Sequence, residues 1–218
     1  MTEPDFVSTA RTFYDTVAAD FAKAYGGDTV SIPLERGLLA AFADLVREDG
    51  GGPVADLGCG AGRVTAHLHA LGLDVFGVDL SAQMLALARL AHPDLRFAEG
   101  SILALDLPDG SLAGLVAWYS TIHTPDAQLP RVLAEFNRVL APGGHALLAF
   151  QVGDAPRHYD EAFGIAVDVD FHRRRPERVA ELLGEAGITA TTRVLREAES
   201  TERTPQAYIL ARKPTGPS

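Results

Sequence analysis

The chain of 218 residues contains a single cysteine, Cys59, so no disulfide can form within it, as is usual for proteins of a reducing compartment. It has no stretch of about 18 continuous apolar residues, the length that a transmembrane helix needs. The first residues, MTEPDFVSTARTF, are acidic and polar and lack the basic start and apolar stretch of a secretory signal. These absences predict a cytoplasmic protein with no membrane partner.

Positive charge is also scarce in this sequence. Lys and Arg number 19 against 29 Asp and Glu, which gives a formal net charge of -10. A chain of this charge repels phosphate backbones, so we expect no nucleic-acid partner. The one obvious basic run, Arg173–Arg175, is expected on a solvated loop. Hydrophobic residues make up 47%, which is typical of a globular protein with a packed core.

Apolar residues follow two different rhythms along the chain. They recur at helical spacing over residues 5–25, before Gly26 and Gly27, and again from Pro33. From residue 53 onward, short apolar segments alternate with amphipathic helices, which predicts a parallel sheet covered on both faces. The expected strands are PVADL, DVFGV, LRFAE, LAGLVAWY and HALLAFQV, at 53–57, 74–78, 95–99, 112–119 and 145–152.

The C-terminal third breaks this alternation of strand and helix. Asp126 is expected to cap a helix that reaches Leu140, and APGG to end it. Residues 164–172 alternate strictly between apolar and polar side chains, as in a half-exposed strand. A helix from Pro176 to about Ala186 is then followed by two segments, 188–197 and 206–212, that could pair as an antiparallel hairpin.

Three glycines, Gly58, Gly60 and Gly62, stand at every second position between the first expected strand and the next helix. Glycine is used where the backbone takes unusual dihedral angles or where another group must approach it closely. A strand, a glycine turn and a helix N-terminus together bind anionic or dinucleotide ligands. The nicotinamide fingerprint needs a third glycine where Arg63 stands, so it fits imperfectly. Asp79 ends the second strand, where a carboxylate can bind a ribose diol.

The segments VADLGCGAGR and VFGVDLS resemble the first two motifs of class I S-adenosylmethionine-dependent methyltransferases. FAEGSILALDLPDGSLAGLVAWYSTIH, RVLAPGGHALLAF and LLGEAGI resemble later segments of that family, in order, and the resemblance extends roughly from Tyr14 to Ala211. It implies a Rossmann-like α/β fold whose seven-stranded, mostly parallel sheet has an antiparallel final strand and helices on both faces. We expect a single domain over 1–218, with N-terminal helices in 1–48 and a lid insertion at 152–175.

The resemblance further implies an activity and its cofactor. S-adenosylmethionine would donate a methyl group to an oxygen, nitrogen or carbon atom of a small-molecule acceptor by in-line displacement. Asp56 would help to hold the ammonium of the cofactor, and Asp79 its ribose. The remaining residues implied to bind the cofactor are Tyr14, Tyr25, Gly58, Cys59, Gly60, Leu80, Met84, Gly100, Ser101, Ile102 and Trp118.

The acceptor is expected beyond the fourth strand, because ligands sit at the carboxyl ends of parallel strands. His123 is the candidate general base there, since its ordinary pKa of about 6.5 suits proton transfer near neutrality. The alternative is a histidine that only hydrogen-bonds within the loop. With His123, the residues expected to bind the acceptor are Tyr119, His158 and Tyr159.

Other interpretations of the same residues stay open. Asp168, Asp170 and His172 share one strand face, but a solvated face explains their alternation, and we expect no metal. The chain could bind S-adenosylmethionine without transferring its methyl group, or it could be a nicotinamide-dependent oxidoreductase. The sequence leaves the identity of the acceptor and the oligomeric state undetermined.

Overall fold

A seven-stranded sheet forms the centre of the protein, which the computed structural model describes over residues 4–25, 32–199 and 202–216. The strand order is β3-β2-β1-β4-β5-β9-β8. Neighbours from β3 to β5 run parallel, and β9 is antiparallel to both β5 and β8, which confirms the predicted sheet. The strands are β1 (Val54–Leu57), β2 (Val75–Asp79), β3 (Arg96–Glu99), β4 (Leu112–Trp118), β5 (Leu140–Gln151), β8 (Thr189–Arg196) and β9 (Gln206–Arg212).

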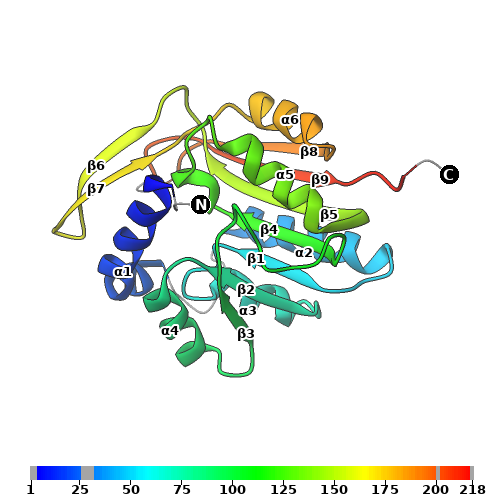
Figure 1. Ribbon diagram of the computed structural model, residues 1–218, viewed down its shortest axis with the longest axis horizontal. Helices are drawn as coiled ribbons and strands as arrows, with labels where there is room; N and C mark the ends of the chain where they lie inside the picture. Colours follow the sequence, from blue (N-terminus) through cyan, green and yellow to red (C-terminus); the bar gives the residue numbers. More distant parts are fainter. Residues whose placement is uncertain (1–3, 26–31, 200–201, 217–218) are drawn as a thin grey trace.

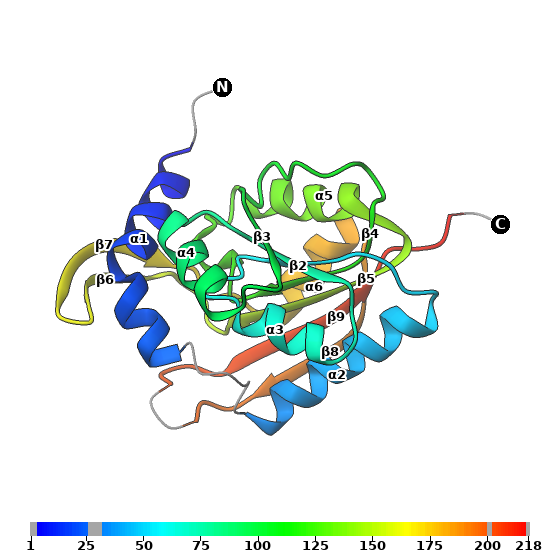
Figure 2. The same cartoon turned by 90° about the horizontal axis from the view of Figure 1, so that it is seen from below.

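Helices cover both faces of this sheet, as Figures 1 and 2 show. The apolar sides of α2 and α3 pack on one face, and those of α5 and α6 pack on the other. Both faces of the inner strands β1, β2, β4, β5 and β9 are thereby largely removed from water, which explains their mostly apolar sequences, whereas β3 and β8 at the two borders of the sheet are mostly exposed. The helices are α1 (Asp5–Tyr25), α2 (Pro33–Glu48), α3 (Arg63–Ala70), α4 (Ala82–Ala91), η1 (Thr121–His123), α5 (Leu129–Val139) and α6 (Pro176–Glu185). Gly26 and Gly27, expected to end the first helix, lie outside the described residues.

A separate two-stranded ribbon lies against α1, at the left of Figure 1. It consists of β6 (Arg157–Ala162) and β7 (Ile165–Phe171) and falls within the segment expected to form a lid. β7 confirms the alternating strand, and its apolar side, including Val169, packs on Phe13 and Val17 of α1. β6 was not predicted, because its sequence RHYDEA is mostly charged and has no apolar rhythm.

The boundary between α5 and β5 differs from the prediction. α5 begins at Leu129 rather than at Asp126, whose carboxylate is bonded to Arg174 instead of capping the helix. β5 begins at Leu140, directly after the helix, and therefore includes the APGG segment that was expected to be a loop. A Cβ on Gly144 would lie 2.9 Å from the Ala141 carbonyl oxygen, so glycine allows the tight strand start.

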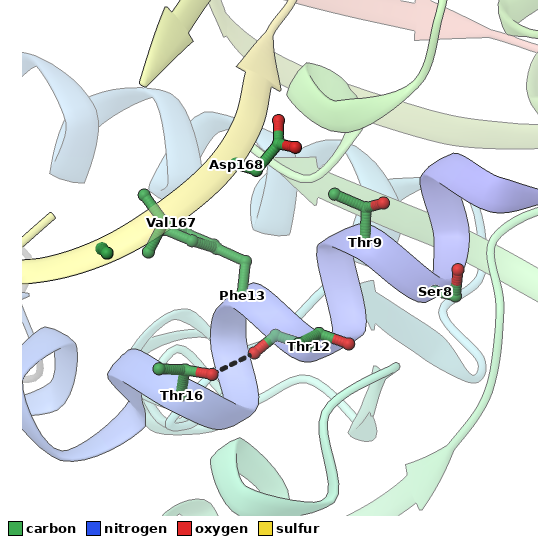
Figure 3. Close-up of a pocket in the computed structure, with 8 residues that line it drawn as sticks. Ser8, Thr9, Thr12, Phe13, Thr16, Val167 and Asp168 are labelled. Carbon is green, nitrogen blue, oxygen red and sulfur yellow. Dashed lines mark hydrogen bonds between the residues drawn. The ribbon is translucent and has the colours of Figure 1, made fainter. Parts of the chain in front are cut away.

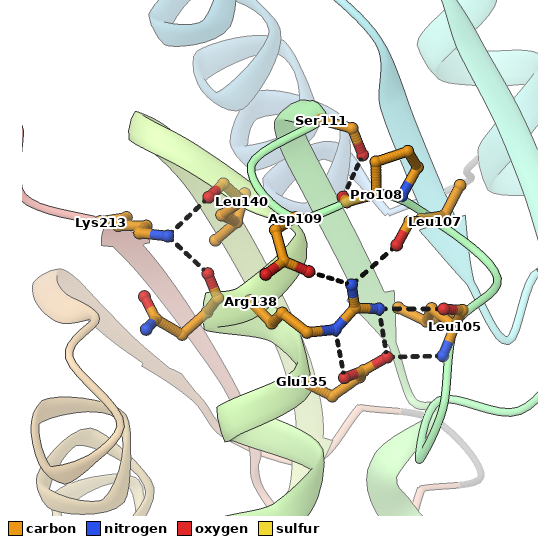
Figure 4. A network of polar contacts seen from close by, with 10 residues as sticks. Leu105, Leu107, Pro108, Asp109, Ser111, Glu135, Arg138, Leu140 and Lys213 are labelled. Carbon is orange, nitrogen blue, oxygen red and sulfur yellow. Dashed lines mark hydrogen bonds and ion pairs between the residues drawn. The ribbon is translucent and has the colours of Figure 1, made fainter.

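Arg138 of α5 ties this helix to the loop that follows β3, as Figure 4 shows. Its guanidinium donates to both carboxylate oxygens of Glu135, to the Leu105 and Leu107 carbonyls and to Asp109. The Glu135 carboxylate also accepts the backbone N–H of Leu105. A planar guanidinium engaged on all three of its nitrogens fixes the path of this loop.

Arg138→Met is expected to lower the free energy of unfolding by about 2 kcal/mol, because several hydrogen bonds between charged groups and the loop are lost. For a chain of this size the midpoint of thermal unfolding should fall by about 4–8 °C. Arg131→Met, at an exposed position of the same helix, is the control and should leave the midpoint within about 1 °C. Equal midpoints for the two variants would contradict this role of Arg138.

Candidate cofactor and acceptor site

The glycine turn joins β1 to α3 at the carboxyl edge of the sheet. Its three glycines have positive φ angles of 74° at Gly58, 53° at Gly60 and 85° at Gly62. A Cβ on Gly58 would overlap the Cβ of Ser120, and one on Gly62 would lie 2.8 Å from the ring of Phe97. A Cβ on Gly60 would meet no atom within 4 Å. Gly58 and Gly62 thus serve internal packing, while Gly60 presents bare backbone to open space.

Asp56 lies at the carboxyl end of β1 and is fully buried. Its Oδ2 accepts a hydrogen bond from the Thr65 hydroxyl at 2.7 Å, but its buried Oδ1 has no partner among the described residues. Burial raises the pKa of Asp56 to about 7, and the nearby charge of Asp79 acts in the same direction. An unpartnered buried carboxylate oxygen is costly alone and is suited to a cationic or N–H-donating ligand.

Asp79 ends β2 beside the glycine turn and is 8% exposed. Its Oδ2 accepts the backbone N–H of Gly60 at 2.7 Å, and its Oδ1 accepts that of Ser81 at 2.8 Å. Burial raises the pKa of this carboxyl group, although the backbone hydrogen bonds oppose the shift. Each carboxylate oxygen has a second lone pair. The two backbone bonds hold Asp79 in place and leave those lone pairs for a diol.

The first turn of α4 lies between this carboxylate and α1. The Ser81 side chain caps α4 by accepting the N–H of Met84, as serine commonly does at the start of a helix. The same hydroxyl donates to Asp15 of α1 at 2.6 Å, and Arg11 donates to the Leu80 carbonyl at 3.4 Å. α1 is therefore docked beside the glycine turn, and Asp15 is a site-flanking carboxylate that sequence reasoning missed.

Tyr14 of α1 reaches His123, the candidate general base. Its hydroxyl lies 3.1 Å from Nε2 of His123, and the Nδ1 of His123 lies 3.1 Å from the Asp170 carbonyl oxygen. Because a carbonyl only accepts, Nδ1 carries the proton, and Nε2 accepts from the tyrosine hydroxyl. Burial lowers the pKa of His123 to about 4, so the imidazole is neutral at pH 7. The structure thus brings Tyr14 and His123 together as a hydrogen-bonded pair.

The residues that follow β4 have unusual features. Tyr119 has a φ of 58°, which is rare for a residue with a side chain and is often found at functional sites. Trp118 Nε1 and Ser120 Oγ are buried and have no hydrogen-bond partner among the described residues. Two polar groups and one strained residue therefore meet at the carboxyl end of β4.

Arg174 overturns the expectation that the Arg173–Arg175 run is solvated. Its side chain is 4% exposed and pairs with Asp126 through Nε at 2.9 Å. Its other nitrogens donate to the carbonyls of Thr121 and Thr124, at either end of η1. The arginine therefore fixes the short helix that carries His123, and no sequence signal distinguished it from its two neighbours.

Arg174→Met should remove both carbonyl contacts of η1 and lower the free energy of unfolding by about 2 kcal/mol. Local loosening should appear as faster amide hydrogen exchange in residues 121–124. Arg173→Met is the matched control, because the Arg173 guanidinium donates to the Ala155 carbonyl on the surface and not to η1. Unchanged amide hydrogen exchange of residues 121–124 in the Arg174→Met variant would contradict the role of Arg174 in holding η1.

The β6–β7 ribbon carries the other predicted acceptor residues. His158 is exposed and pairs with Asp170, with Nδ1 3.0 Å from Oδ1. Tyr159 lies against Phe171, whose ring is 4.7 Å from that of His123. Phe171 thereby connects the ribbon to His123. Within the described ranges, no group of three or more His, Cys, Asp or Glu side chains is arranged to hold a metal ion.

Two cavities open where α1 meets β7. The larger, of about 470 Å³, lies between the first half of α1 and β7 (Figure 3). The smaller, of about 200 Å³, is lined by His123, Asp170 and His172 among others. Neither is lined by the glycine turn or by Asp79, so both are distinct from the candidate cofactor residues.

The remaining predicted cofactor residues differ in accessibility. Met84 is fully buried and Leu80 is partly buried, while Tyr25 is 59% exposed and lies beside Phe163 at the ribbon turn. Gly100 donates its N–H to the Asp79 carbonyl, so the loop of Gly100, Ser101 and Ile102 begins next to that residue. Burial raises the pKa of the Cys59 thiol, which makes it a packing residue of the turn rather than a nucleophile.

Helices long and apolar enough to cross a membrane are absent from the described part of the chain.

Comparison with known proteins gives concordant results. Residues 54–144 match the family model described as a methyltransferase domain. The chain is 34% identical over 128 residues to a malonyl-(acyl-carrier protein) O-methyltransferase of Pectobacterium atrosepticum, covering 59% of this chain and 50% of that protein. It is 33% identical over 139 residues to a demethylmenaquinone methyltransferase of Thermus thermophilus, covering 61% and 60%. The chain thus spans half to three fifths of the length of these curated relatives.

A solved structure resembles the whole fold. The Burkholderia thailandensis 1,6-didemethyltoxoflavin-N1-methyltransferase, with bound 1,6-didemethyltoxoflavin and S-adenosylhomocysteine, superposes with a TM-score of 0.72 at 20% identity, over 98% of this chain and 92% of that one.

Proposed function

Because this chain belongs to the class I S-adenosylmethionine-dependent methyltransferases, by its match over residues 54–144 and by its fold, we propose that it methylates a small-molecule acceptor with S-adenosylmethionine. One observation carries the proposal. The bare backbone of Gly60 faces open space and its N–H is bonded to the buried Asp79, while the buried carboxylate of Asp56 on β1 has one oxygen without a partner among the described residues. Anionic groups around an open turn suit a ligand with a cationic ammonium and sulfonium.

The chemical character of the residues at the glycine turn suits this cofactor. Asp56 Oδ1 would accept from the ammonium, and the free lone pairs of Asp79 would accept from the ribose hydroxyls. The loop of Gly100, Ser101 and Ile102, with Leu80, would border the adenine. When bound, the cofactor supplies a methyl carbon already activated by positive sulfur. The protein has to align the acceptor, exclude water and, for a protonated acceptor, remove its proton.

His123 is proposed to orient Tyr14 on the acceptor side. An imidazole whose pKa is about 4 accepts a proton poorly at neutral pH, and both of its nitrogens are hydrogen-bonded. It would act as a base only if a bound ligand took the Tyr14 hydroxyl away from Nε2. Because Tyr14 is also one of the residues implied to bind the cofactor, His123→Ala should weaken cofactor binding as well as turnover. Undiminished turnover would remove His123 from the mechanism.

The test is a calorimetric titration of the protein with S-adenosylmethionine, S-adenosylhomocysteine and NAD. We expect micromolar binding of the first two and none of NAD. Methyl transfer is then measured with methyl-labelled S-adenosylmethionine and a panel of small hydroxyl, thiol, amine and carboxyl acceptors. Binding without transfer to any acceptor would favour a cofactor-binding protein that does not methylate. Binding of NAD alone would overturn the proposal.

Affinity for S-adenosylmethionine should depend on pH through Asp56, which faces Thr65, Asp79 and Arg63. The ionised carboxylate attracts the ammonium, and its pKa of about 7 means that it becomes protonated as the pH falls below 7. Affinity should therefore fall by up to about tenfold per unit of pH below 7. Asp56→Asn should flatten this dependence. Equal affinities of the wild-type protein at pH 6 and pH 8 would contradict the proposed contact between Asp56 and the ammonium.

A further inference from the structure

A buried chain of hydrogen bonds runs from the carboxyl end of β4 to the first turn of α2. The Tyr119 hydroxyl lies 3.4 Å from that of Tyr208 on β9. Tyr208 donates to Glu35 Oε1 at 2.9 Å and receives a hydrogen bond from Arg196 Nε at 3.3 Å. Tyr208 is 1% exposed and Glu35 is 5% exposed. Sequence analysis singled out Tyr119 but neither Tyr208 nor Glu35.

The hydrogen bonds of this chain have a defined direction. Tyr208 has one proton, which it gives to Glu35, because an ionised carboxylate only accepts. The Tyr119 hydroxyl must then be the donor in its contact with Tyr208. The oxygen of Tyr119 keeps its lone pairs for another donor. Each hydroxyl proton thus points toward Glu35. The chain of hydrogen bonds begins at Tyr119, which is partly exposed and can accept a further hydrogen bond; we call this residue the open end of the chain.

The open end lies where the acceptor is expected. Tyr119 is the first residue after β4, at the carboxyl edge of the sheet where ligands of this fold bind. The next residue, Ser120, touches Gly58 of the glycine turn closely enough that a Cβ on Gly58 would clash with it. The positive φ of Tyr119 turns the chain out of the strand at this point.

We propose that Tyr119, Tyr208 and Glu35 form a proton relay that serves a hydroxyl acceptor. The proposal rests on the proposed methyltransferase function and names the acceptor class of that site. As the acceptor oxygen bonds to the methyl carbon, the carbon–sulfur bond breaks and its electron pair stays on sulfur. The acceptor proton passes to Tyr119, the Tyr119 proton to Tyr208, and the Tyr208 proton to Glu35, which releases it to water between turnovers. Tyr119 touches the acceptor, and the other two act through it.

The surroundings of Glu35 suit a proton acceptor. Burial raises the pKa of Glu35, while hydrogen bonding from Tyr208 and the charges of Arg63 and Arg196 limit the shift. Arg196 is itself held by both carboxylate oxygens of Glu202, at 2.8 and 2.7 Å, so its charge is largely compensated. The charge of Glu202 also raises the pKa of Glu35. A carboxylate with a raised pKa is a stronger base than one on the surface.

The experiment compares, for each variant, an acceptor that must lose its proton with an acceptor of the same skeleton that is already largely ionised. Pairs of a phenol and the thiophenol of the same skeleton are offered with methyl-labelled S-adenosylmethionine at pH 8, where a thiol is far more ionised than a phenol. Glu35→Gln and Tyr208→Phe should lower kcat/KM for the phenol by about 100-fold, the usual contribution of general base catalysis. The same variants should change the thiophenol reaction by less than about threefold. Glu35→Asp should recover part of the phenol reaction.

Glu48→Gln, at the other end of α2, is the matched control and should alter neither reaction. Calorimetry with S-adenosylmethionine and thermal unfolding check that each variant binds and folds. Equal losses for phenol and thiophenol, or no loss, would overturn the relay. So would cofactor binding without methylation of any hydroxyl acceptor. If the wild-type protein does not bind S-adenosylmethionine, the proposed function itself fails, which is a distinct outcome.

Discussion

Asp79→Ala is expected to weaken binding of S-adenosylmethionine by about 100-fold, or about 3 kcal/mol, because a charged acceptor for two ribose hydroxyls is lost. The side chain also fixes the glycine turn by accepting the Gly60 N–H, so part of the loss comes from a less ordered turn. Calorimetric titration with S-adenosylmethionine and S-adenosylhomocysteine measures the effect. Both ligands carry the same ribose and should lose affinity alike.

Asp74→Ala is the control variant, because it also removes one aspartate next to β2. Asp74 precedes β2, is exposed and forms a surface ion pair with Arg96, so its removal should change affinity by less than about twofold. Thermal unfolding of both variants separates lost binding from lost folding. Wild-type affinity in a folded Asp79→Ala protein would show that this carboxylate does not hold the ribose.

The glycine turn allows a second prediction with a large effect. Gly58→Ala should lower the free energy of unfolding by about 4 kcal/mol, since the new Cβ would overlap Ser120 and the φ of 74° disfavours any side chain. Gly60→Ala should cost only about 1 kcal/mol, because its Cβ meets open space and the strain at a φ of 53° is the main penalty. It should nevertheless reduce cofactor affinity more than tenfold by filling the space beside the bare backbone.

Gly72→Ala provides a matched control for this comparison. Gly72 has a φ of 87°, and a Cβ added to it would also meet no atom within 4 Å, but it lies in the turn between α3 and β2. It should lose a similar amount of stability to Gly60→Ala and bind the cofactor normally. Thermal unfolding and calorimetry are the two measurements. A Gly60→Ala protein that binds as tightly as the Gly72→Ala protein would place the ligand elsewhere.

The sequence was informative wherever a pattern is local. The order of the five parallel strands along the chain, the capping of α4 by Ser81 and the alternation of β7 follow from apolar periodicity and from single capping residues. The glycine turn and the carboxylate at the end of β2 were recognised from the same kind of local pattern, and their role in cofactor binding stays a prediction.

Contacts between distant segments could not be predicted in this way. Arg174 reads as one of three adjacent arginines, and only the packing of the segment after β7 against η1 makes it buried. Glu35 and Tyr208 are separated by 173 positions, so no spacing rule connects them. β6 pairs with β7 through backbone hydrogen bonds, which its charged side chains do not reveal. The pairing of His123 with Tyr14 likewise depends on where α1 docks.

The position of β9 has a consequence for biosynthesis. It is the last strand of the described chain, yet it lies between β5 and β8 rather than at the border of the sheet. Until residues 206–212 have been synthesised, β5 keeps a free backbone edge beside its buried apolar side chains, and β8 has no neighbour to join. A nascent chain in this condition resembles an exposed edge strand, which invites aggregation. Chaperone demand during translation should therefore be greatest just before β9 emerges.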